Sequence, residues 1–261
     1  MRPAEELKRI FQEGWNVPAR VANYVRNVAE AEFTEGDRYE AWRAALDSAV
    51  HVPIGVQVLD VGTGPGIFAC LYARMGHRCV GLDFSNRMLA EATKRAEQLR
   101  VACEFVFGDA ESLPFDAARF DVVSSRHLLF NLPRPGLALR EWFRVLKPGG
   151  RMILIGDEPE GHSGRLNGGR VQRMIAWCRN RWFRNQLNGW HPKPDYLKAV
   201  AECPLFRNAT PEMLRTLMEA IGLCDIRSCS TGAIYAARLQ KSASRSGRCT
   251  RPFILVGLKP L

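Results

Sequence analysis

The sequence predicts an α/β fold in which a mostly parallel sheet is covered by helices on both faces. Short apolar runs alternate with stretches whose apolar side chains recur at helical spacing. Several of these runs end in a carboxylate or another polar residue, and one passes into a helix through a glycine-rich turn. Parallel strands need a crossover connection, usually a helix, so this alternation favours a parallel sheet.

The first strand and its turn occupy residues 58–66, Val-Leu-Asp-Val-Gly-Thr-Gly-Pro-Gly. The run contains an acid, Asp60, and residues 67–73 begin a helical pattern. A turn with so few side chains lets a ligand reach backbone N–H groups at a helix N-terminus, which indicates a nucleotide-like ligand. The alternatives are a dinucleotide site, whose third glycine comes one residue later, and a tight turn with no ligand. The glycines are Gly62, Gly64 and Gly66.

The second strand, residues 78–83, ends in Asp83, 17 residues past Gly66. A carboxylate at that distance can accept hydrogen bonds from two ribose hydroxyls, whereas the alternative is a solvated strand end. Ser85 is placed to cap the following helix, which we expect to run to about Leu99.

Three further elements complete the predicted parallel sheet. A third strand and its loop occupy 103–111, where Asp109 can accept from an exocyclic amine of a base. A fourth strand begins at 120 and ends in Arg126 and His127. We expect a helix over about 135–146, ended by the Pro-Gly-Gly turn at 148–150, and a fifth strand at 152–155. In such sheets ligands bind beyond the carboxyl ends of the strands, where these polar residues fall.

Residues 56–157 resemble the S-adenosyl-L-methionine (SAM)-binding core of class I methyltransferases. The resemblance implies a Rossmann-like sheet of seven strands, mostly parallel, with a C-terminal antiparallel hairpin. It disfavours a nicotinamide enzyme, in which the Leu-Lys-Pro-Gly-Gly sequence is not expected. Five stretches match in order and spacing: Leu59–Gly66, Asp83, Gly108–Ala110, Phe120–Val123 and Leu146–Gly150.

The resemblance also implies a cofactor, SAM, with S-adenosyl-L-homocysteine (SAH) as product. Backbone near Gly62 would meet the methionine part, Asp83 the ribose and Asp109 the adenine amine. Met88 would pack on the adenine. Arg126 could bind either the SAM carboxylate or an anionic substrate, and we favour the SAM carboxylate. The expected cofactor-binding residues are Trp15, Tyr24, Asp60, Gly62, Thr63, Gly64, Gly66, Asp83, Phe84, Met88, Gly108, Asp109, Ala110 and Arg126.

The resemblance divides the chain into four parts. Residues 1–50 would form a helical lid over the 51–160 core, 161–205 a substrate cap, and 206–261 the C-terminal part of the core. Class I lids often carry Trp-Asp and Tyr-Asp pairs, but here Asn16 follows Trp15 and Val25 follows Tyr24. The alternative is that both aromatic side chains only pack the helices.

The chain has a formal net charge of +10, and the whole excess lies in residues 151–261. Residues 161–194 hold six arginines, one lysine and no acid, with tryptophan and phenylalanine interleaved. Such a segment suits an anionic or aromatic small molecule, or RNA, or is only a solvated helix face. The expected substrate-binding residues are His127, His162, Arg170, Trp177 and Arg181.

The expected chemistry is methyl transfer by in-line displacement, for which the protein supplies orientation and exclusion of water. A base is needed only where the accepting O, N, S or C atom must lose a proton. His127, just past the fourth strand on the ligand side, is the candidate base, and the alternative is a loop histidine satisfied by backbone contacts.

In the C-terminal part, Thr210 should cap a helix that begins at Pro211 and ends before Gly222. Strands at 224–228 and 253–258 would form the hairpin, and 241–248 reads as a polar loop.

These features favour a cytoplasmic methyltransferase of small molecules. Two alternatives stay open: an RNA or protein methyltransferase, and a non-catalytic SAM-binding protein. No apolar run approaches the length of a membrane span, no secretory leader is visible, and no C-x-x-C pair suggests a metal site. We therefore expect no membrane partner and no metal, and the sequence leaves the oligomeric state open.

Overall fold

A computed structural model describes residues 2–26, 36–159, 194–206, 209–242 and 250–261. Its centre is a seven-stranded sheet of order β3-β2-β1-β4-β5-β7-β6. Strands β1 to β5 pair in parallel, whereas β7 is antiparallel to both β5 and β6. The predicted fold is confirmed. The strands are β1 (Gln57–Val61), β2 (Arg78–Asp83), β3 (Cys103–Phe107), β4 (Phe120–Arg126), β5 (Leu146–Pro159), β6 (Cys224–Cys229) and β7 (Thr250–Leu258).

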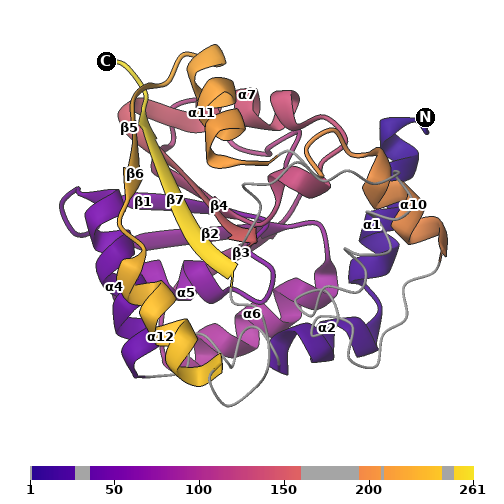
Figure 1. Ribbon diagram of the computed structural model, residues 1–261, viewed down its shortest axis with the longest axis horizontal. Coiled ribbons are helices and arrows are strands. Elements are labelled where there is room, and N and C mark those ends of the chain that lie inside the picture. Colours follow the sequence, from indigo (N-terminus) through magenta and orange to yellow (C-terminus); the bar gives the residue numbers. More distant parts are fainter. Residues whose placement is uncertain (1, 27–35, 160–193, 207–208, 243–249) are drawn as a thin grey trace.

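Helices cover both faces of the sheet (Figure 1). On one face lie α4 (Asp37–Val50), α5 (Ile67–Arg74), α6 (Asn86–Leu99) and α12 (Gly232–Ser242). On the other lie α7 (Pro135–Val145) and α11 (Pro211–Ala220). Three helices gather at the end of the sheet near the N-terminus: α1 (Ala4–Trp15), α2 (Pro18–Tyr24) and α10 (Pro194–Glu202). No helix in the described ranges has the length and apolar character needed to cross a membrane.

The two faces of the sheet carry separate hydrophobic cores because side chains alternate along each strand. Leu59 and Val61 of β1 join the core under α7 and α11, which is centred on Trp142. Val58 joins the opposite core, which is centred on Trp42 and Phe68. A third cluster holds α1 against α10 through Leu7, Ile10, Phe11, Tyr196, Ala199, Val200 and Cys203.

Strand β5 is longer than the sequence predicts. Helix α7 ends at Val145, and the predicted turn at 147–150 is instead part of the strand. Gly149 N–H donates to Lys259 O, and Lys259 N–H donates to Gly150 O, both at 2.9 Å. Gly149 nevertheless adopts a φ of 73°, and the register of β5 with β4 shifts between Leu146 and Arg151. The Pro-Gly-Gly sequence therefore forms an irregularity within the strand.

The C-terminal part follows its capping signals. The Thr210 hydroxyl accepts from Met213 N–H at 3.3 Å, Pro211 is the first helical residue, and Gly222 adopts a φ of 96°. Both predicted strands are present. The prediction of a loop from residue 241 was wrong at its start, because helix α12 continues to Ser242. Residues 243–249 lie outside the described residues.

Gly66 shows how tightly the first turn is packed. Its φ is 71°, and a Cβ there would lie 2.9 Å from Ala92 Cβ of α6 and 3.1 Å from Phe105 Cζ. Gly55 has a φ of 90°, but no other atom lies within 4 Å of the place that a Cβ would take there. Comparing Gly66 with Gly55 therefore distinguishes the effect of steric overlap from the effect of backbone strain.

We expect Gly66→Ala to lower the free energy of unfolding by about 2–4 kcal/mol, since it adds overlap to left-handed strain. Gly55→Ala should cost only about 1 kcal/mol, from strain alone. Urea unfolding of both variants measures the difference. Equal losses would show that the contact with α6 is easily relaxed.

Candidate functional site

The glycine turn after β1 is tied to the end of β2. Gly62, Gly64 and Gly66 have φ values of 71°, 53° and 71°, which favour glycine. Gly62 N–H and Thr63 N–H both donate to Leu82 O, at 2.8 and 3.0 Å. A Cβ on Gly62 would lie 2.8 Å from the Leu128 side chain. The turn is therefore held close to the strand ends in a conformation that leaves backbone exposed.

Two buried carboxylates flank this turn. Asp60 accepts from the Thr63 hydroxyl at 2.7 Å, and burial raises the pKa of Asp60 to about 7. Asp83 accepts from Gly64 N–H and from Ser85 N–H, both at 2.9 Å. Burial raises the pKa of Asp83 to about 6, although these backbone donors oppose the shift. Ser85 caps α6 as predicted, accepting from Met88 N–H at 3.2 Å.

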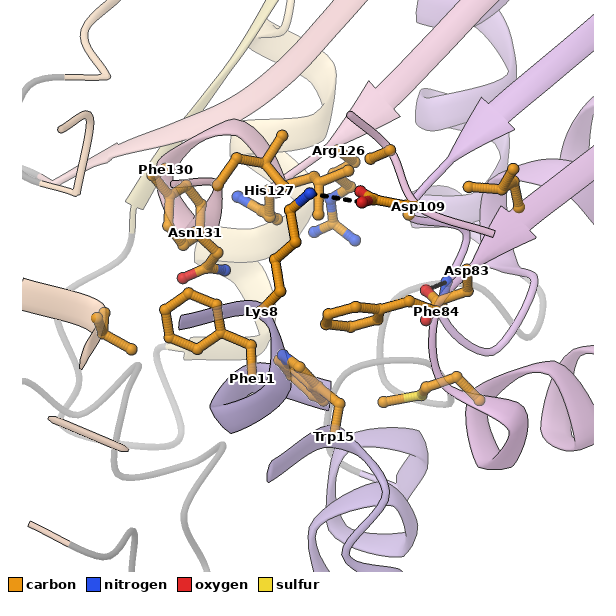
Figure 2. Close-up of a pocket in the computed structure, with 18 of the residues that line it drawn as sticks. Lys8, Phe11, Trp15, Asp83, Phe84, Asp109, Arg126, His127, Phe130 and Asn131 are labelled. Carbon is orange, nitrogen blue, oxygen red and sulfur yellow. Dashed lines mark hydrogen bonds and ion pairs between the residues drawn. The ribbon is translucent and has the colours of Figure 1, made fainter. Parts of the chain in front are cut away.

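A pocket opens at the carboxyl ends of the strands, and most of the predicted cofactor residues line it (Figure 2). Asp60, Thr63 and Gly66 do not line it but shape the turn behind it. Of the predicted substrate residues, His127 lines the pocket, whereas His162, Arg170, Trp177 and Arg181 lie outside the described residues. The predicted residues that the pocket brings together are Trp15, Tyr24, Gly62, Gly64, Asp83, Phe84, Met88, Gly108, Asp109, Ala110 and Arg126.

Helices α1, α2 and α10 form one wall of the pocket. The rings of Trp15 and Tyr24 meet edge to face at 5.5 Å between centroids. The guanidinium of Arg20 lies 3.5 Å from the Trp15 ring centroid and donates to Tyr196 Oη at 2.7 Å. Burial lowers the pKa of Arg20. Asn16, which replaces the expected aspartate, accepts from the Ser85 hydroxyl at 2.9 Å and so ties this wall to α6.

Lys8 is the main pocket residue that the sequence reasoning missed. Its Nζ lies 2.5 Å from Asp109 Oδ2 and 2.7 Å from Glu111 Oε2, crossing the pocket from α1 (Figure 2). Burial opposes the charge on Lys8, but the two carboxylates outweigh it and raise its pKa. The signal was available, because Lys8, Phe11 and Trp15 recur at helical spacing on one face.

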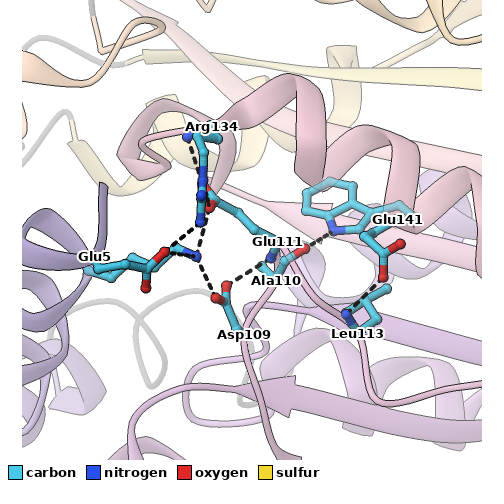
Figure 3. Close-up of polar contacts among 9 residues, drawn as sticks. Glu5, Asp109, Ala110, Glu111, Leu113, Arg134 and Glu141 are labelled. Carbon is cyan, nitrogen blue, oxygen red and sulfur yellow. Dashed lines mark hydrogen bonds and ion pairs between the residues drawn. The ribbon is translucent and has the colours of Figure 1, made fainter. Parts of the chain in front are cut away.

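The Lys8 contact belongs to a wider ionic network (Figure 3). Arg134 Nε and its backbone N–H donate to the fully buried carboxylate of Glu111, at 2.8 and 2.6 Å. Arg134 Nη2 also lies 2.7 Å from Glu5 Oε1. Two residues of α1, Glu5 and Lys8, are therefore paired with the loops after β3 and β4.

His127 follows β4 with a φ of 56°, and its N–H donates to Ile155 O at 3.1 Å. Its Nε2 lies 3.3 Å from Asp157 Oδ2, and Asp157 Oδ1 lies 2.8 Å from Arg238 Nη1. Burial, with the charge of Arg126, lowers the pKa of His127, although Asp157 opposes the shift. The imidazole is therefore neutral near pH 7, the state that a general base requires.

Comparison with protein families gives one match for the core. A family described as "Methyltransferase domain" matches residues 59–154, which contain the glycine turn, Asp83, Asp109 and His127. Residues 59–154 therefore match a methyltransferase domain. In the part of the chain that the structure describes, no group of three or more His, Cys, Asp or Glu side chains is placed to hold a metal ion.

The chain is also similar to curated bacterial enzymes. Over 116 residues it is 40% identical to a demethylmenaquinone methyltransferase of Clavibacter sepedonicus, covering 44% of this chain and 46% of the relative. Over 122 residues it is 38% identical to a ubiquinone/menaquinone biosynthesis C-methyltransferase of Roseobacter denitrificans, covering 45% and 48%. The chain thus spans about half the length of these relatives.

Solved structures share the fold at low sequence identity. Haemonchus contortus phosphoethanolamine N-methyltransferase 2, in complex with SAM, has a TM-score of 0.61 at 18% identity, covering 92% of this chain and 57% of that one. The [4+2]-cyclase SpnF has a TM-score of 0.57 at 22% identity, covering 86% and 81%. Since a methyltransferase and a cyclase share this fold, the fold alone does not decide the reaction.

We expect Lys8→Met to release helix α1 from the methyltransferase domain, because Asp109 and Glu111 would then face each other without the ammonium. Native-state hydrogen exchange at the amides of residues 5–15 should accelerate about tenfold or more. Arg9→Met, which removes a cation paired with Glu13 on the exposed side of α1, is the control and should leave exchange unchanged. Equal exchange in the Lys8 variant and the unaltered protein would show that apolar contacts alone hold α1.

The raised pKa of Asp60 should make the free energy of unfolding depend on pH. The unfolded chain ionises Asp60 from about pH 3.8, whereas the folded chain keeps the proton to about pH 7. The favourable contribution is present below pH 3.8 and is lost as the pH rises through 7. In Asp60→Asn, the unfolding free energy should fall less between pH 4 and 7, by on the order of 2–4 kcal/mol in total. Urea titrations at several pH values measure this, and parallel curves for the two proteins would contradict the raised pKa.

Proposed function

We propose that the protein transfers a methyl group from SAM to a small, planar aromatic acceptor of the quinol type. One observation carries the proposal: a single pocket joins the nucleotide-type residues of the core to an aromatic wall. Asp83 and Asp109 lie on one side, and Phe11 and Trp15 lie on the other (Figure 2). The glycine turn and Tyr196 also line this pocket. The names of the quinone methyltransferase relatives support this acceptor class.

The residues of the core fit the cofactor. The left-handed glycines leave no side chain over the turn, and the Asp83 carboxylate is fixed by two backbone donors at the end of β2. Asp83 would accept from the ribose hydroxyls and Asp109 from the adenine amine, while Met88 packs on the base. Arg126 would bind the SAM carboxylate. SAM itself would supply the methyl group from an electrophilic sulfonium.

The helices on the aromatic side would exclude water and orient the acceptor. Residues 1–50 would act as the lid, since α1 and α2 contribute Lys8, Phe11, Trp15, Arg20 and Tyr24 to the pocket. The 161–205 cap would contribute α10, whose Tyr196 and Val200 also line the pocket. Residues 206–261 would complete the core. His127 would take a proton from the acceptor.

The other two functions have less support. An RNA or protein acceptor was expected to use the basic C-terminal half. Its most basic segment, residues 161–194, lies outside the described residues except for Pro194. A non-catalytic SAM-binding protein would need no aromatic wall next to the nucleotide residues. The acceptor assay separates these possibilities from the proposed reaction.

The test measures SAH formation by the full chain from SAM and a 1,4-naphthoquinol that carries no substituent at ring carbon 2. We expect SAH and a ring-methylated product in equal amounts. Asp83→Asn should weaken SAH binding by about 10- to 100-fold, because a charged acceptor of ribose hydrogen bonds is lost. Asp121→Asn, at the opposite end of β4, is the matched control. Binding of SAH without any methylated acceptor would favour the non-catalytic alternative, and no SAH binding would refute the assigned cofactor site.

A further inference from the structure

A group of buried charged side chains lies next to His127. Of these, only Arg126 was predicted as a site residue. Asp157 comes from β5 and Arg238 from α12, and each side chain is only 7% exposed. Asp157 lies between the imidazole and the guanidinium, with its Oδ2 3.3 Å from His127 Nε2 and its Oδ1 2.8 Å from Arg238 Nη1. The three residues thus form a chain from helix α12 to the wall of the pocket.

The backbone fixes both ends of the His127–Asp157 contact. His127 is anchored to β5 by its N–H bond to Ile155 O, and Asp157 follows two residues later on the same face of that strand. Asp157 is paired with Pro252 in the β5–β7 ladder, and α12 packs against β7 and α4. The backbone that carries this carboxylate is therefore held in place by the C-terminal strand.

We propose that Asp157 and Arg238 are positioning residues that hold His127 with its Nε2–H directed to Asp157, so that Nδ1 takes the acceptor's proton. This inference rests on the proposed function. It adds two residues and a tautomer to the proposed site. A neutral imidazole that donates from Nε2 carries its lone pair on Nδ1, as the two ring nitrogens have opposite roles.

The charges around the imidazole support this arrangement. Among the described residues, Arg126 of β4, Asp157 of β5 and Arg238 of α12 are the charged groups that act on His127. Burial opposes the charge of Asp157, but Arg238 and His127 outweigh it and hold its pKa well below the ordinary range. Asp157 therefore stays an acceptor for Nε2–H at working pH, and it stabilises the imidazolium once Nδ1 has gained a proton.

The proton and electron pairs balance in one transfer. The acceptor atom forms its bond to the methyl carbon, and the electron pair of the breaking carbon–sulfur bond stays on sulfur. The acceptor's proton goes to His127 Nδ1, at the bond-forming step for an O, N or S atom or directly after it for a ring carbon. The imidazolium then returns the proton to water. Asp157 keeps its charge throughout and does not take the proton.

The first test reads the tautomer without any acceptor. Nitrogen–proton correlation spectra of protein labelled with 15N-histidine, with His127 assigned by its loss in His127→Gln, report which ring nitrogen carries hydrogen. We expect the Nε2–H form in the unaltered protein at pH 8 and its loss in Asp157→Asn. An Nδ1–H form of His127 in the unaltered protein overturns the inference, and this result does not depend on whether Asp157→Asn folds.

The second test measures turnover with the same 1,4-naphthoquinol. We expect Asp157→Asn to lower kcat by about 100-fold, within the range for loss of general base action. The dissociation constant of SAH should change less than about threefold. Asp121→Asn makes the same substitution in an ion pair with Lys147, at 2.8 Å and far from the pocket, and should leave kcat unchanged.

A merely structural role for Asp157 predicts a different pattern. If Asp157 acts through His127, adding Asp157→Asn to His127→Gln lowers kcat no further, whereas independent effects would multiply. Asp157→Glu should restore part of kcat and the acid limb of the pH–rate profile. A protein that methylates the acceptor while Asp157→Asn keeps full kcat overturns the role of Asp157 alone. A protein that binds SAH but methylates nothing overturns the proposed function and this role together.

Discussion

The pocket depends on how the chain leaves β1. Because Gly62 and Gly64 adopt left-handed φ values, the turn folds back onto the end of β2, where Leu82 O accepts from Gly62 and Thr63. The same turn brings Gly64 N–H to the Asp83 carboxylate. Helix α5 then begins beside the pocket, close to α6. A side chain at Gly62 would overlap Leu128, and one at Gly64 would be strained by its left-handed φ alone.

The pKa values of three buried carboxylates near the strand ends are shifted in opposite directions. Asp60 and Asp83 are held by a hydroxyl and by backbone N–H groups, and burial raises the pKa of both. Asp157 faces a guanidinium and an imidazole, which hold its pKa low in spite of burial. Burial alone therefore does not set the charge of an acid. The donors that tertiary packing brings to it decide whether it stays ionised.

Local patterns predicted the parts of the site that lie within one strand and its turn. The acid at the end of β2, the Ser85 cap and the polar end of β4 each follow an apolar run, so their place at the sheet edge could be read from the sequence. The contacts between distant segments could not. Lys8 meets Asp109 across 101 positions, Arg20 meets Tyr196 across 176, and Arg238 meets Asp157 across 81. Their partners are set by helix packing. In β5 the predicted Pro-Gly-Gly turn became an irregularity within a longer strand, which pairs with β7.

The Lys8–Asp109 ion pair must be exchanged when a ligand binds at Asp109. A ligand amine that approaches this carboxylate meets an acceptor that already holds an ammonium from the same chain. Binding is then an exchange of donors, and Lys8 acts as a tethered competitor whose effective concentration is set by the docking of α1. Glu111, 2.7 Å from the same Nζ, offers the displaced lysine a second partner, which lowers the cost of the exchange. Binding of a ligand amine at Asp109 and the position of helix α1 would therefore be coupled in one equilibrium.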